Sequence, residues 1–493
     1  MLPRARLNVF AQFIRPRSSV LFSRLHLGAL HAGGALLLSL WGFTYALTPP
    51  KVYLDGRKTS DQLGAPEQYE QYEPLPFQRQ KPLDRFRERS RIDVDEELRR
   101  HEQTHLPERG SGIARYDIAQ LASNDPIEDD HAEAILPVPS GHWSFFAILD
   151  GHNGWETSAW LRDNLIPAVA GALADLFNNF SSSLTPGTEP DPPPDDIEDT
   201  IQATFKRLDD DIVYNAVERV FETNSRHAGV TLLAPAYAGS CALLAFYDDH
   251  TRVLRIAVTG DSRAVLGRPA FDERGQAIYE VCVLSVEQDA HNVAEEYRLN
   301  AQHPGEAVVA NGRVLGMGPS RAFGDARHKW SRRVQERLKE AFLGRTPPRD
   351  VRTPPYLTAV PEVTSIRAQP GDFLILATDG LWESLTSAEA VGLVGLWQDG
   401  HTKEGEAPRE MAPVPPSELP VEVHPEDEEE TVRYRQWCAE KRFVNCDQNP
   451  ATHLVRNALG GADSDLAAAL MSMRSPRARV YRDDISAVVV FFE

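Results

Sequence analysis

The chain has 493 residues, 42% of them hydrophobic, which is enough for one large buried core or two smaller ones and excludes a disordered protein. Its formal net charge of −20 argues against a nucleic-acid partner, because phosphate backbones are bound mainly through clustered lysines and arginines. The four cysteines show no C-x-x-C spacing, and a chain of this length needs no disulfide, so we expect free thiols.

The N-terminal segment differs in composition from the rest of the chain. Residues 1–54 contain no Asp or Glu, and their arginines are spread among apolar and serine positions, which is typical of a mitochondrial presequence. Within it, residues 27–47 are uncharged and approach the ~20 apolar residues that cross a bilayer. Two interpretations stay open for this stretch: an inner-membrane anchor or sorting signal, or the tail of a cleaved presequence. We therefore predict a mitochondrial protein, in the matrix or at the inner membrane.

Residues 55–110 are charged, punctuated by proline and poor in apolar periodicity, so we predict a polar linker. One polar helix is expected near its end, from Val94 to His105. The main folded region is expected to extend from residue 111 to residue 493. Two proline-rich or acidic stretches within it, 181–196 and 401–430, are predicted to be surface inserts.

Short apolar runs in this region predict buried strands, and most of them meet an aspartate at one end. These runs are His142–Leu149, Ser240–Tyr247, Val253–Val258, Phe373–Thr378 and Ile485–Phe492. Apolar residues near i, i+3 and i+4 predict helices between them. The helices are Trp155–Phe180, Ile197–Phe221, Val293–Ala301, Ser387–Trp397 and Thr452–Leu459. Hairpins mixed with helices favour an α+β fold, a central antiparallel β-sandwich flanked by α-helices.

Four aspartates lie at the ends of strongly apolar strands: Asp150, Asp261, Asp379 and Asp483. Each alone is an ordinary turn signal. Packed strands bring their ends together, however, and converging carboxylates repel unless divalent cations neutralise them. Oxygen ligands without a His or Cys cluster favour Mg²⁺ or Mn²⁺ over Zn²⁺. A pair of such ions can lower the pKa of a bridging water and clamp a phosphoryl group for in-line attack.

Six motifs surround these aspartates in a fixed order. They are Glu128-Asp129, Phe146–Gly154, Gly260–Ala264, Ser320–Asp325, Leu376–Trp382 and Arg482–Ser486. Together they resemble the motif set of the type 2C, metal-dependent protein phosphatases over about 111–493. The resemblance implies that this region is a phosphatase catalytic domain. Three further stretches resemble the branch of that family that acts on mitochondrial pyruvate dehydrogenase. These are Gln120–Asp129, Arg321–Ser331 and Thr353–Val363.

The resemblance implies a set of ligands for two cations, Mg²⁺ or Mn²⁺, with room for a third. Asp150 would bridge two cations, and the Gly151 carbonyl, Asp379 and Asp483 would complete their ligands. Asp261 would hold the third cation together with Asp379 and Glu383. Most members of the family have Asp where this chain has Glu383, which makes the third position less secure.

The resemblance also implies roles around the cations. Glu128 and Asp129 would hold metal-bound waters, and His152 would act with Asp150 as a catalytic residue, protonating the leaving serine oxygen. Asn124 stands at the phosphate-binding position, where most of the family has Arg, and Asp484 stands where Asn is common; the pyruvate dehydrogenase branch shares both departures. The expected substrate and partner is a phosphoprotein, the E1α subunit of pyruvate dehydrogenase, and the need for a regulatory subunit is left open.

Two alternatives come from other functional classes. His101-Glu102-Gln-Thr-His105 is a literal H-E-x-x-H, which on a helix can place two histidines on one face for Zn²⁺, as in a metalloprotease. Its surroundings are charged on every side, which favours solvated histidines instead. A catalytically weak pseudophosphatase is the other alternative. Retention of the four ligand aspartates argues against it, because clustered carboxylates cost stability once metal binding is unneeded.

Overall fold

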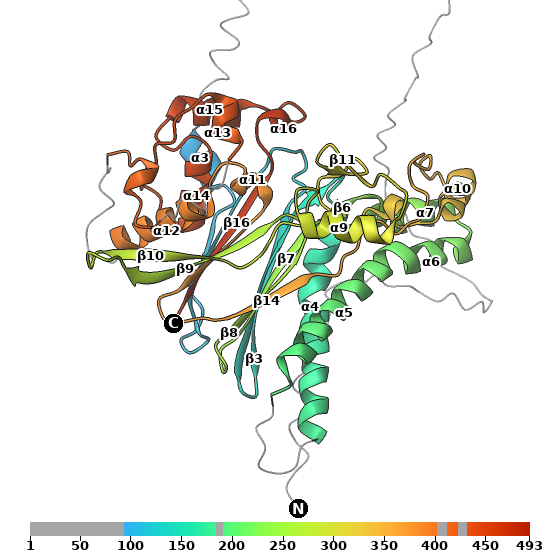
Figure 1. Ribbon diagram of the computed structural model, residues 1–493, viewed down its shortest axis with the longest axis horizontal. Helices are drawn as coiled ribbons and strands as arrows, with labels where there is room; N and C mark the ends of the chain where they lie inside the picture. Colours follow the sequence, from blue (N-terminus) through green and yellow to red (C-terminus); the bar gives the residue numbers. More distant parts are fainter. Residues whose placement is uncertain (1–92, 184–190, 402–411, 423–430) are drawn as a thin grey trace, which may run out of the picture. The chain divides into compact units, whose positions relative to one another are not determined.

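The computed structural model describes residues 93–183, 191–401, 412–422 and 431–493 (Figure 1). Two antiparallel sheets form its centre. The first contains, in order, β1 (Gln103–His105), β2 (Ile113–Leu121), β16 (Ile485–Phe492), β15 (Phe373–Ala377), β9 (Arg263–Phe271) and β10 (Ala277–Val283). The second contains β14 (Glu362–Arg367), β8 (Val253–Thr259), β7 (Ala242–Asp248), β4 (Gly141–Leu149) and β3 (Asp130–Val138). The predicted α+β sandwich is confirmed, and every predicted strand is present within a few residues of its expected bounds.

The central strands are apolar on both faces because both faces are covered. In β4, Phe146 and Ile148 pack between the two sheets, whereas Phe145, Ala147 and Leu149 point into the core under the helices. Residues of β16 divide in the same way between the space between the sheets and the opposite helical layer. This explains why these strands appear in the sequence as continuous apolar runs rather than as alternating ones.

Helices cover the outer faces of both sheets (Figure 1). Over the second sheet, the covering elements are α4 (Glu156–Ser183), α5 (Pro194–Asp210), the π-helix η1 (Asp211–Asn215) and α6 (Ala216–Thr223). Over the first sheet, they are α3 (Val94–Arg99), α11 (Asp379–Trp382), α12 (Ser387–His401), α14 (Pro450–Ala458) and α15 (Ser464–Ser472). The predicted helix Ile197–Phe221 is therefore interrupted by a π-helical turn, and the other four helices predicted between the strands are confirmed with small shifts at their ends.

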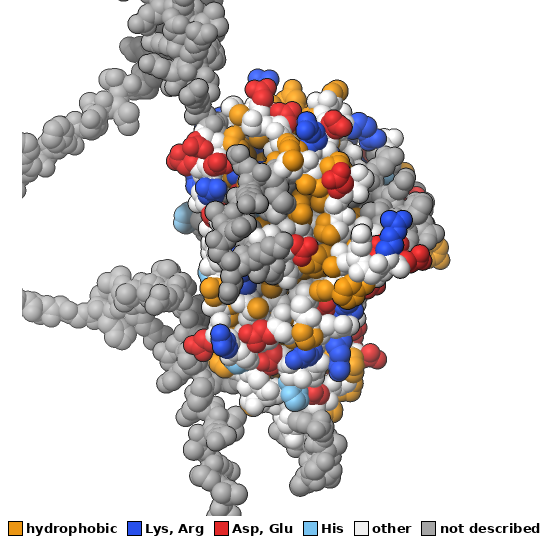
Figure 2. Space-filling model, turned by 90° about the vertical axis from the view of Figure 1, so that its left-hand side faces the viewer, with side chains coloured by type: hydrophobic (Ala, Val, Ile, Leu, Met, Phe, Trp, Pro, Cys, Tyr) orange, Lys and Arg blue, Asp and Glu red, His pale blue; other side chains and the backbone are white. Residues whose placement is uncertain are grey.

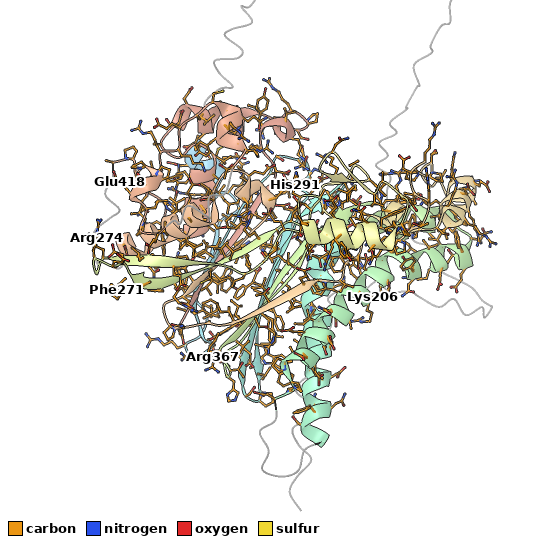
Figure 3. The ribbon with its side chains drawn as sticks, in the orientation of Figure 1. Lys206, Phe271, Arg274, His291, Arg367 and Glu418 are labelled. Atoms are coloured by element: carbon orange, nitrogen blue, oxygen red, sulfur yellow. The ribbon has the colours of Figure 1, made fainter. Side chains whose placement is uncertain are left out.

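Shorter elements connect these layers. The remaining helices are α7 (Arg226–Leu232), α8 (Ala234–Tyr237), α9 (Val293–Gln302), η2 (Ala326–His328), α10 (Arg332–Ala341), η3 (Pro416–Glu418), α13 (Arg433–Trp437) and α16 (Ala478–Tyr481). Two small sheets are formed by β11 (Val309–Ala310) with β12 (Arg313–Val314), and by β5 (Gly151–His152), β6 (Gly239–Ser240) and β13 (Phe323–Gly324). In Figure 3, the β9–β10 hairpin carries Phe271 and Arg274 at its outer end.

The predicted helix Val94–His105 is wrong in its second half. Helix α3 ends at Arg99, and Gln103–His105 form β1, which pairs antiparallel with β2. Strand pairing prevails because the Thr104 hydroxyl donates a 2.6 Å hydrogen bond to Asp117 and the His105 ring stacks on Tyr116. The two histidines of the H-E-x-x-H motif therefore do not share a helix, which contradicts the zinc-helix hypothesis.

Several predictions concern residues that the structure describes only in part. The presequence 1–54, its segment 27–47 and most of the linker 55–110 lie outside the described residues. In the region 181–196, α4 continues to Ser183 and α5 begins at Pro194. Within 401–430, Leu419 is buried in the core under the first sheet. Among the described residues, no helix is both long and apolar enough to cross a bilayer.

Charges of both signs are distributed over the surface. On the face shown in Figure 2, acidic and basic side chains are interspersed, and hydrophobic side chains lie between them. The net charge of the whole chain is −20, so acidic residues outnumber basic ones. That face offers no continuous basic surface of the kind that binds a nucleic-acid backbone.

Candidate functional site

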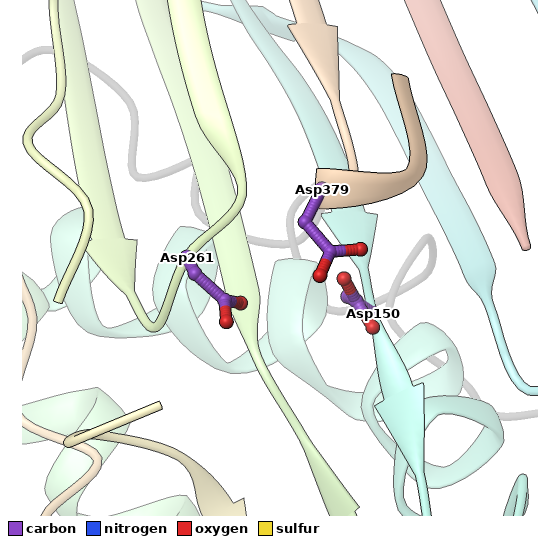
Figure 4. Close-up of side chains that lie close together, drawn as sticks. All are labelled: Asp150, Asp261 and Asp379. Carbon is purple, nitrogen blue, oxygen red and sulfur yellow. The ribbon is translucent and has the colours of Figure 1, made fainter. Parts of the chain in front are cut away.

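Three of the predicted aspartates meet at one end of the sandwich, between the two sheets (Figure 4). Asp150 follows β4 of the second sheet, and Asp379 follows β15 of the first sheet as the first residue of α11. Asp261 lies where the chain passes from β8 to β9, from one sheet to the other. One carboxylate oxygen of each lies within 4.8 Å of the others. The strand ends thus bring together residues far apart in the sequence.

The electrostatics of this aspartate cluster call for a cation. Burial, and then repulsion by Asp379, Asp129 and Asp261, raises the pKa of Asp150 well above its ordinary value. Burial and the charge of Asp261 do the same to the pKa of Asp379. Carboxylates so placed cannot all ionise near neutral pH unless positive charge neutralises them. An all-oxygen donor set of this kind fits Mg²⁺ or Mn²⁺.

The remaining predicted ligands lie beside this cluster. Asp483, just before β16, is not one of its three members and forms an ion pair with Arg479. Glu383, one residue beyond α11, accepts a 2.7 Å hydrogen bond from Arg433. Gly151 packs so closely that a Cβ there would collide with the Glu128 carbonyl oxygen. The roles of these residues as ligands stay predictions.

Asp484 organises the loop between β2 and β3. One of its oxygens accepts from the backbone amides of Ser123 at 2.5 Å and Asn124 at 2.9 Å. The other accepts from the Glu128 amide at 2.9 Å and from the Asn124 side chain at 3.1 Å. Both oxygens are needed as acceptors, and an asparagine at 484 would offer only one. This explains in physical terms why the chain has Asp at this position.

The residues predicted to bind the phosphate and the metal-bound waters lie on that loop. The Asn124 amide nitrogen donates to Glu128 Oε2 at 3.1 Å as well as to Asp484, so it helps to fix the loop. Asp129 is buried and accepts a 3.0 Å hydrogen bond from Thr378. Burial, and then the charge of Asp484, raises the pKa of Asp129 to about 8. The loop therefore adds further carboxylates beside the aspartate cluster.

His152 is held by a residue to which the sequence analysis gave no role. Its Nε2 lies 2.5 Å from Oδ2 of Asp325. The small sheet explains this contact, because β6 pairs with β5 at His152 and with β13 at Gly324, next to Asp325. Gly239 is required between them, since a Cβ there would collide with both side chains.

The His152–Asp325 pair favours the protonated imidazole. Burial opposes the charged ring, but the adjacent carboxylate of Asp325 outweighs it and raises the pKa of His152 above its ordinary value. The pKa of Asp325 is correspondingly lowered by His152, against the effect of its own burial. A charged imidazole beside the aspartate cluster is suited to donate a proton. The only sequence signal for Asp325 was its place at the end of the motif Ser320–Asp325.

Cys241 is a second residue that the sequence analysis missed. Its Sγ donates to Asp261 Oδ1 at 3.0 Å, and its backbone amide donates to the Asp150 carbonyl at 2.8 Å. A Cβ on Gly260, whose φ is +108°, would collide with Sγ, so the glycine allows the thiol to lie behind the cluster. No spacing pattern marks a lone buried cysteine as part of a site.

The zinc alternative finds no support in the described part of the chain. There, the one group of three or more potential metal-binding side chains is the aspartate cluster. His105 Nε2 instead lies 3.2 Å from Gln103 Oε1, and the exposed His101 follows the end of α3. His101 is thus exposed, as the charged surroundings predicted, whereas His105 is half-buried against the Tyr116 ring.

Comparison with known proteins gives consistent similarities. The family described as protein phosphatase 2C matches residues 123–413. The chain is 41% identical over 394 residues to a protein phosphatase 2C homolog of Schizosaccharomyces pombe, covering 78% of this chain and 81% of the relative. It is 35% identical over 429 residues to mitochondrial pyruvate dehydrogenase (acetyl-transferring) phosphatase 1 of Saccharomyces cerevisiae, covering 81% and 72%. Against the human protein of that name, the identity is 31% over 445 residues, covering 78% of each chain.

Proposed function

The chain belongs to the protein phosphatase 2C family and is a protein serine/threonine phosphatase, and from this premise we propose that it dephosphorylates the E1α subunit of mitochondrial pyruvate dehydrogenase with bound Mg²⁺ or Mn²⁺. The resemblance drawn from the motifs is confirmed by these relatives. The pseudophosphatase alternative is set aside, because the aspartate cluster and the His152–Asp325 pair are both present.

The aspartate cluster carries the metal-dependent part of this proposal. Asp150, Asp261 and Asp379 present oxygens within 4.8 Å of one another, and their raised pKa values show that the protein alone does not neutralise them. Two cations would be held by Asp150, Gly151, Asp379 and Asp483, and a third by Asp261, Asp379 and Glu383. When bound, such cations lower the pKa of a coordinated water and neutralise the phosphoryl oxygens.

The chain's own residues supply the rest of the chemistry. Asp484 fixes the loop that carries Asn124 and Glu128, so the wall beside the phosphoryl group stays in place. His152, charged through its pairing with Asp325, donates a proton to the departing serine oxygen. Proton donation matters because a serine alkoxide is a poor leaving group. A water oxygen replaces the serine oxygen on phosphorus, so the products are an unmodified serine residue of the substrate protein and inorganic phosphate.

The substrate is proposed from the relatives. Those of Saccharomyces cerevisiae and human are named as phosphatases of mitochondrial pyruvate dehydrogenase, and the aligned region covers more than two thirds of each. The stretches Gln120–Asp129 and Thr353–Val363 match that branch of the family. We expect a phosphoprotein partner and no nucleic acid.

Phosphate release from phosphorylated E1α tests the substrate and the cations together. We expect release with Mg²⁺ or Mn²⁺, none in EDTA, and a rate on E1α well above the rate on an unrelated phosphoserine protein. Equal rates on the two proteins would contradict the proposal that E1α is the specific substrate. Undiminished release in EDTA would contradict the role of the cations, because the charge of Arg479 offsets the repulsion in the cluster only in part and the pKa of Asp150 stays raised.

A mitochondrial location, in the matrix or at the inner membrane, is part of the proposal. It is supported by the acid-free composition of residues 1–54 and by the names of the relatives. Residues 1–54 fused to a fluorescent protein should direct it to mitochondria, and cytosolic fluorescence would contradict this. Carbonate extraction of the full chain then separates an anchor at 27–47 from a cleaved tail, since only an anchor stays in the membrane pellet.

A further inference from the structure

A cavity of about 450 Å³ lies beside the catalytic loop and has no role in the chemistry above. It lies where the end of α3, the end of β2 and the segment from α15 to α16 come together, elements grouped in Figure 1. Its polar and sulfur-bearing walls include Arg100, His101, Ser123, Met471, Arg474 and Arg482. Asn124 also lines it, so the cavity and the candidate active site share one loop.

Arg482 is a buried cation that forms no ion pair, although the charges of Asp484 and Glu97 act on it from nearby. Its side chain donates to two backbone carbonyls, of Ala122 at 2.7 Å and of Leu470 at 3.3 Å. Within the described part of the chain, it forms no ion pair, and its Nη2 donates no hydrogen bond. Buried charges are normally paired, because their desolvation is costly. Arg482 is only 5% exposed, so its unpaired charge indicates a place for an anion.

Ser123 adds a second unsatisfied group to the same cavity. Its residue is 3% exposed, and its hydroxyl has no hydrogen-bond partner. Buried hydroxyls are nearly always hydrogen-bonded, so an orphan in a cavity wall indicates a missing partner. The backbone amide of Ser123 is already bound to Asp484, which leaves the hydroxyl as its free donor.

The other charges around the cavity favour an anion as well. Exposed Arg474 forms no ion pair with any described residue. Glu97 also lines the cavity; it is paired with Arg100, and its charge acts on Arg482 only from a distance. Asp125 is the other acidic lining residue, and it is exposed to solvent. Arg474 and Arg482 therefore remain as unpaired cations in a chain whose net charge is −20.

We propose that this cavity binds an anionic side chain of the phosphoprotein substrate, a carboxylate or a second phosphate, near the phosphoserine that is hydrolysed. A phosphopeptide at the active site must pass the loop that bears Ser123 and Asn124, and a residue flanking its phosphoserine then enters the cavity. The inference rests on the protein phosphatase activity, but not on E1α as the particular substrate. His101, from the H-E-x-x-H motif that forms no zinc site, is then part of the wall of this cavity.

Synthetic phosphoserine peptides test this directly. A neutral parent peptide is compared with variants that carry one Glu, or a second phosphoserine, at each position within eight residues on either side. We expect wild-type kcat/KM to rise roughly 5- to 10-fold at one or two of these positions, as for a partly exposed charge-assisted contact. A flat profile would overturn the proposal. Loss of turnover on the neutral parent would instead count against the phosphatase chemistry, so the two failures are distinguishable.

Matched variants assign any preference to the cavity. The variant Arg474→Gln, which removes the exposed unpaired cation, should weaken the preference for the acidic peptide roughly two- to fivefold and leave turnover of the neutral peptide unchanged. Arg477→Gln is the control, because Arg477 is exposed in the same segment, lies against the Tyr481 ring and does not line the cavity. It should keep the preference. Equal loss in the control would show a general effect of surface charge and overturn the assignment to the cavity.

Inorganic phosphate separates a substrate subsite from a free-anion site. With EDTA present, wild-type protein should bind phosphate in calorimetry at millimolar concentration, and Arg474→Gln should bind it roughly two- to fivefold more weakly. This readout does not depend on turnover. Phosphate binding without any preference among the peptides would overturn the substrate assignment, since the cavity would then hold only the free ion.

Discussion

Two groups of buried carboxylates in this protein have opposite electrostatics. In the aspartate cluster, burial and mutual repulsion raise the pKa of Asp150 and Asp379. Glu295, at the start of α9, is 2% exposed, whereas the three aspartates of the cluster are half-buried, and burial alone would raise the pKa of Glu295 too. Hydrogen bonds from Arg321, Arg298 and Ser320 outweigh that effect and lower it to about 2.

The difference lies in where the positive charge comes from. Arg321 donates to Glu295 at 2.6 Å and Arg298 at 2.7 Å, so the fold neutralises this carboxylate permanently. The aspartate cluster has no such cation bound to it, although the charge of Arg479 acts on it from the edge. A carboxylate that the fold neutralises serves stability, whereas carboxylates left unneutralised are available to an exchangeable cation.

The largest expected effect breaks the aspartate cluster. Asp150→Asn should lower kcat/KM by at least about 10³-fold, because a lost shared ligand forfeits several kcal/mol of transition-state stabilisation. The stability of the metal-free protein should not fall, since the change removes repulsion. Steady-state kinetics on a phosphoserine peptide and urea unfolding in EDTA measure the two effects. Near-normal turnover at high Mn²⁺ would refute the role of Asp150.

The His152–Asp325 pair lies between these extremes, because its carboxylate has a single side-chain cation. His152→Ala should slow turnover of a phosphoserine peptide by ~10²–10⁴-fold, the usual contribution of a positioned general acid. Turnover of p-nitrophenyl phosphate should fall much less, because nitrophenolate leaves without a proton. Metal affinity, measured by calorimetry, should barely change. Equal losses on both substrates would remove His152 from the catalytic residues.

The same kind of substitution in the other group should act on stability alone. Glu295→Gln leaves Arg321 and Arg298 without their buried anion and should lower the free energy of unfolding by about 3 kcal/mol. Metal affinity should stay unchanged. Glu295→Gln is thus the control for Asp150→Asn: it should lower stability and leave the metal site intact, whereas Asp150→Asn should damage the metal site and leave stability intact. A loss of metal affinity at unchanged stability would show that the two groups are not separate.

The pH dependence of stability sharpens the contrast and has the smallest expected effect. In EDTA, the free energy of unfolding should fall as pH rises above about 4, since the folded cluster keeps protons that unfolded carboxyls release. The pKa of Asp129 is about 8, so the free energy of unfolding should continue to fall until the pH reaches about 8. Mg²⁺ at 100 times its Kd should restore about 2.7 kcal/mol.

Glu295 should act with the opposite sign. Because its folded pKa is about 2, its contribution is present above its ordinary pKa of 4.5 and is lost as pH falls towards 2. Urea unfolding of wild type and Glu295→Gln over this range measures the difference. If their stabilities did not converge at the acidic end, the ion pairs would not be the source of the Glu295 contribution.

Several parts of the fold and site were predictable from the sequence. Strands such as Ile485–Phe492 are buried on both faces, so they stand out as unbroken apolar runs. Asp150, Asp261 and Asp379 are marked by their positions at strand ends, and the motifs around them resemble one family. Local rules failed at His101–His105, where helical spacing predicted one helix and pairing with β2 imposed a strand.

The sequence by itself determined the strands, the family and the aspartates at the strand ends, because apolar runs and short motifs are local properties of the chain. Only the tertiary structure decided which charges are neutralised. Asp325 reaches His152 across 173 residues, and Cys241 lies against Asp261 because β7 and β8 pair. Pairing across sheets sets distance and burial, and these two quantities fix each pKa. Distance and burial thus give the aspartate cluster raised pKa values and Glu295 a lowered one, although the sequence shows only acidic residues in both places.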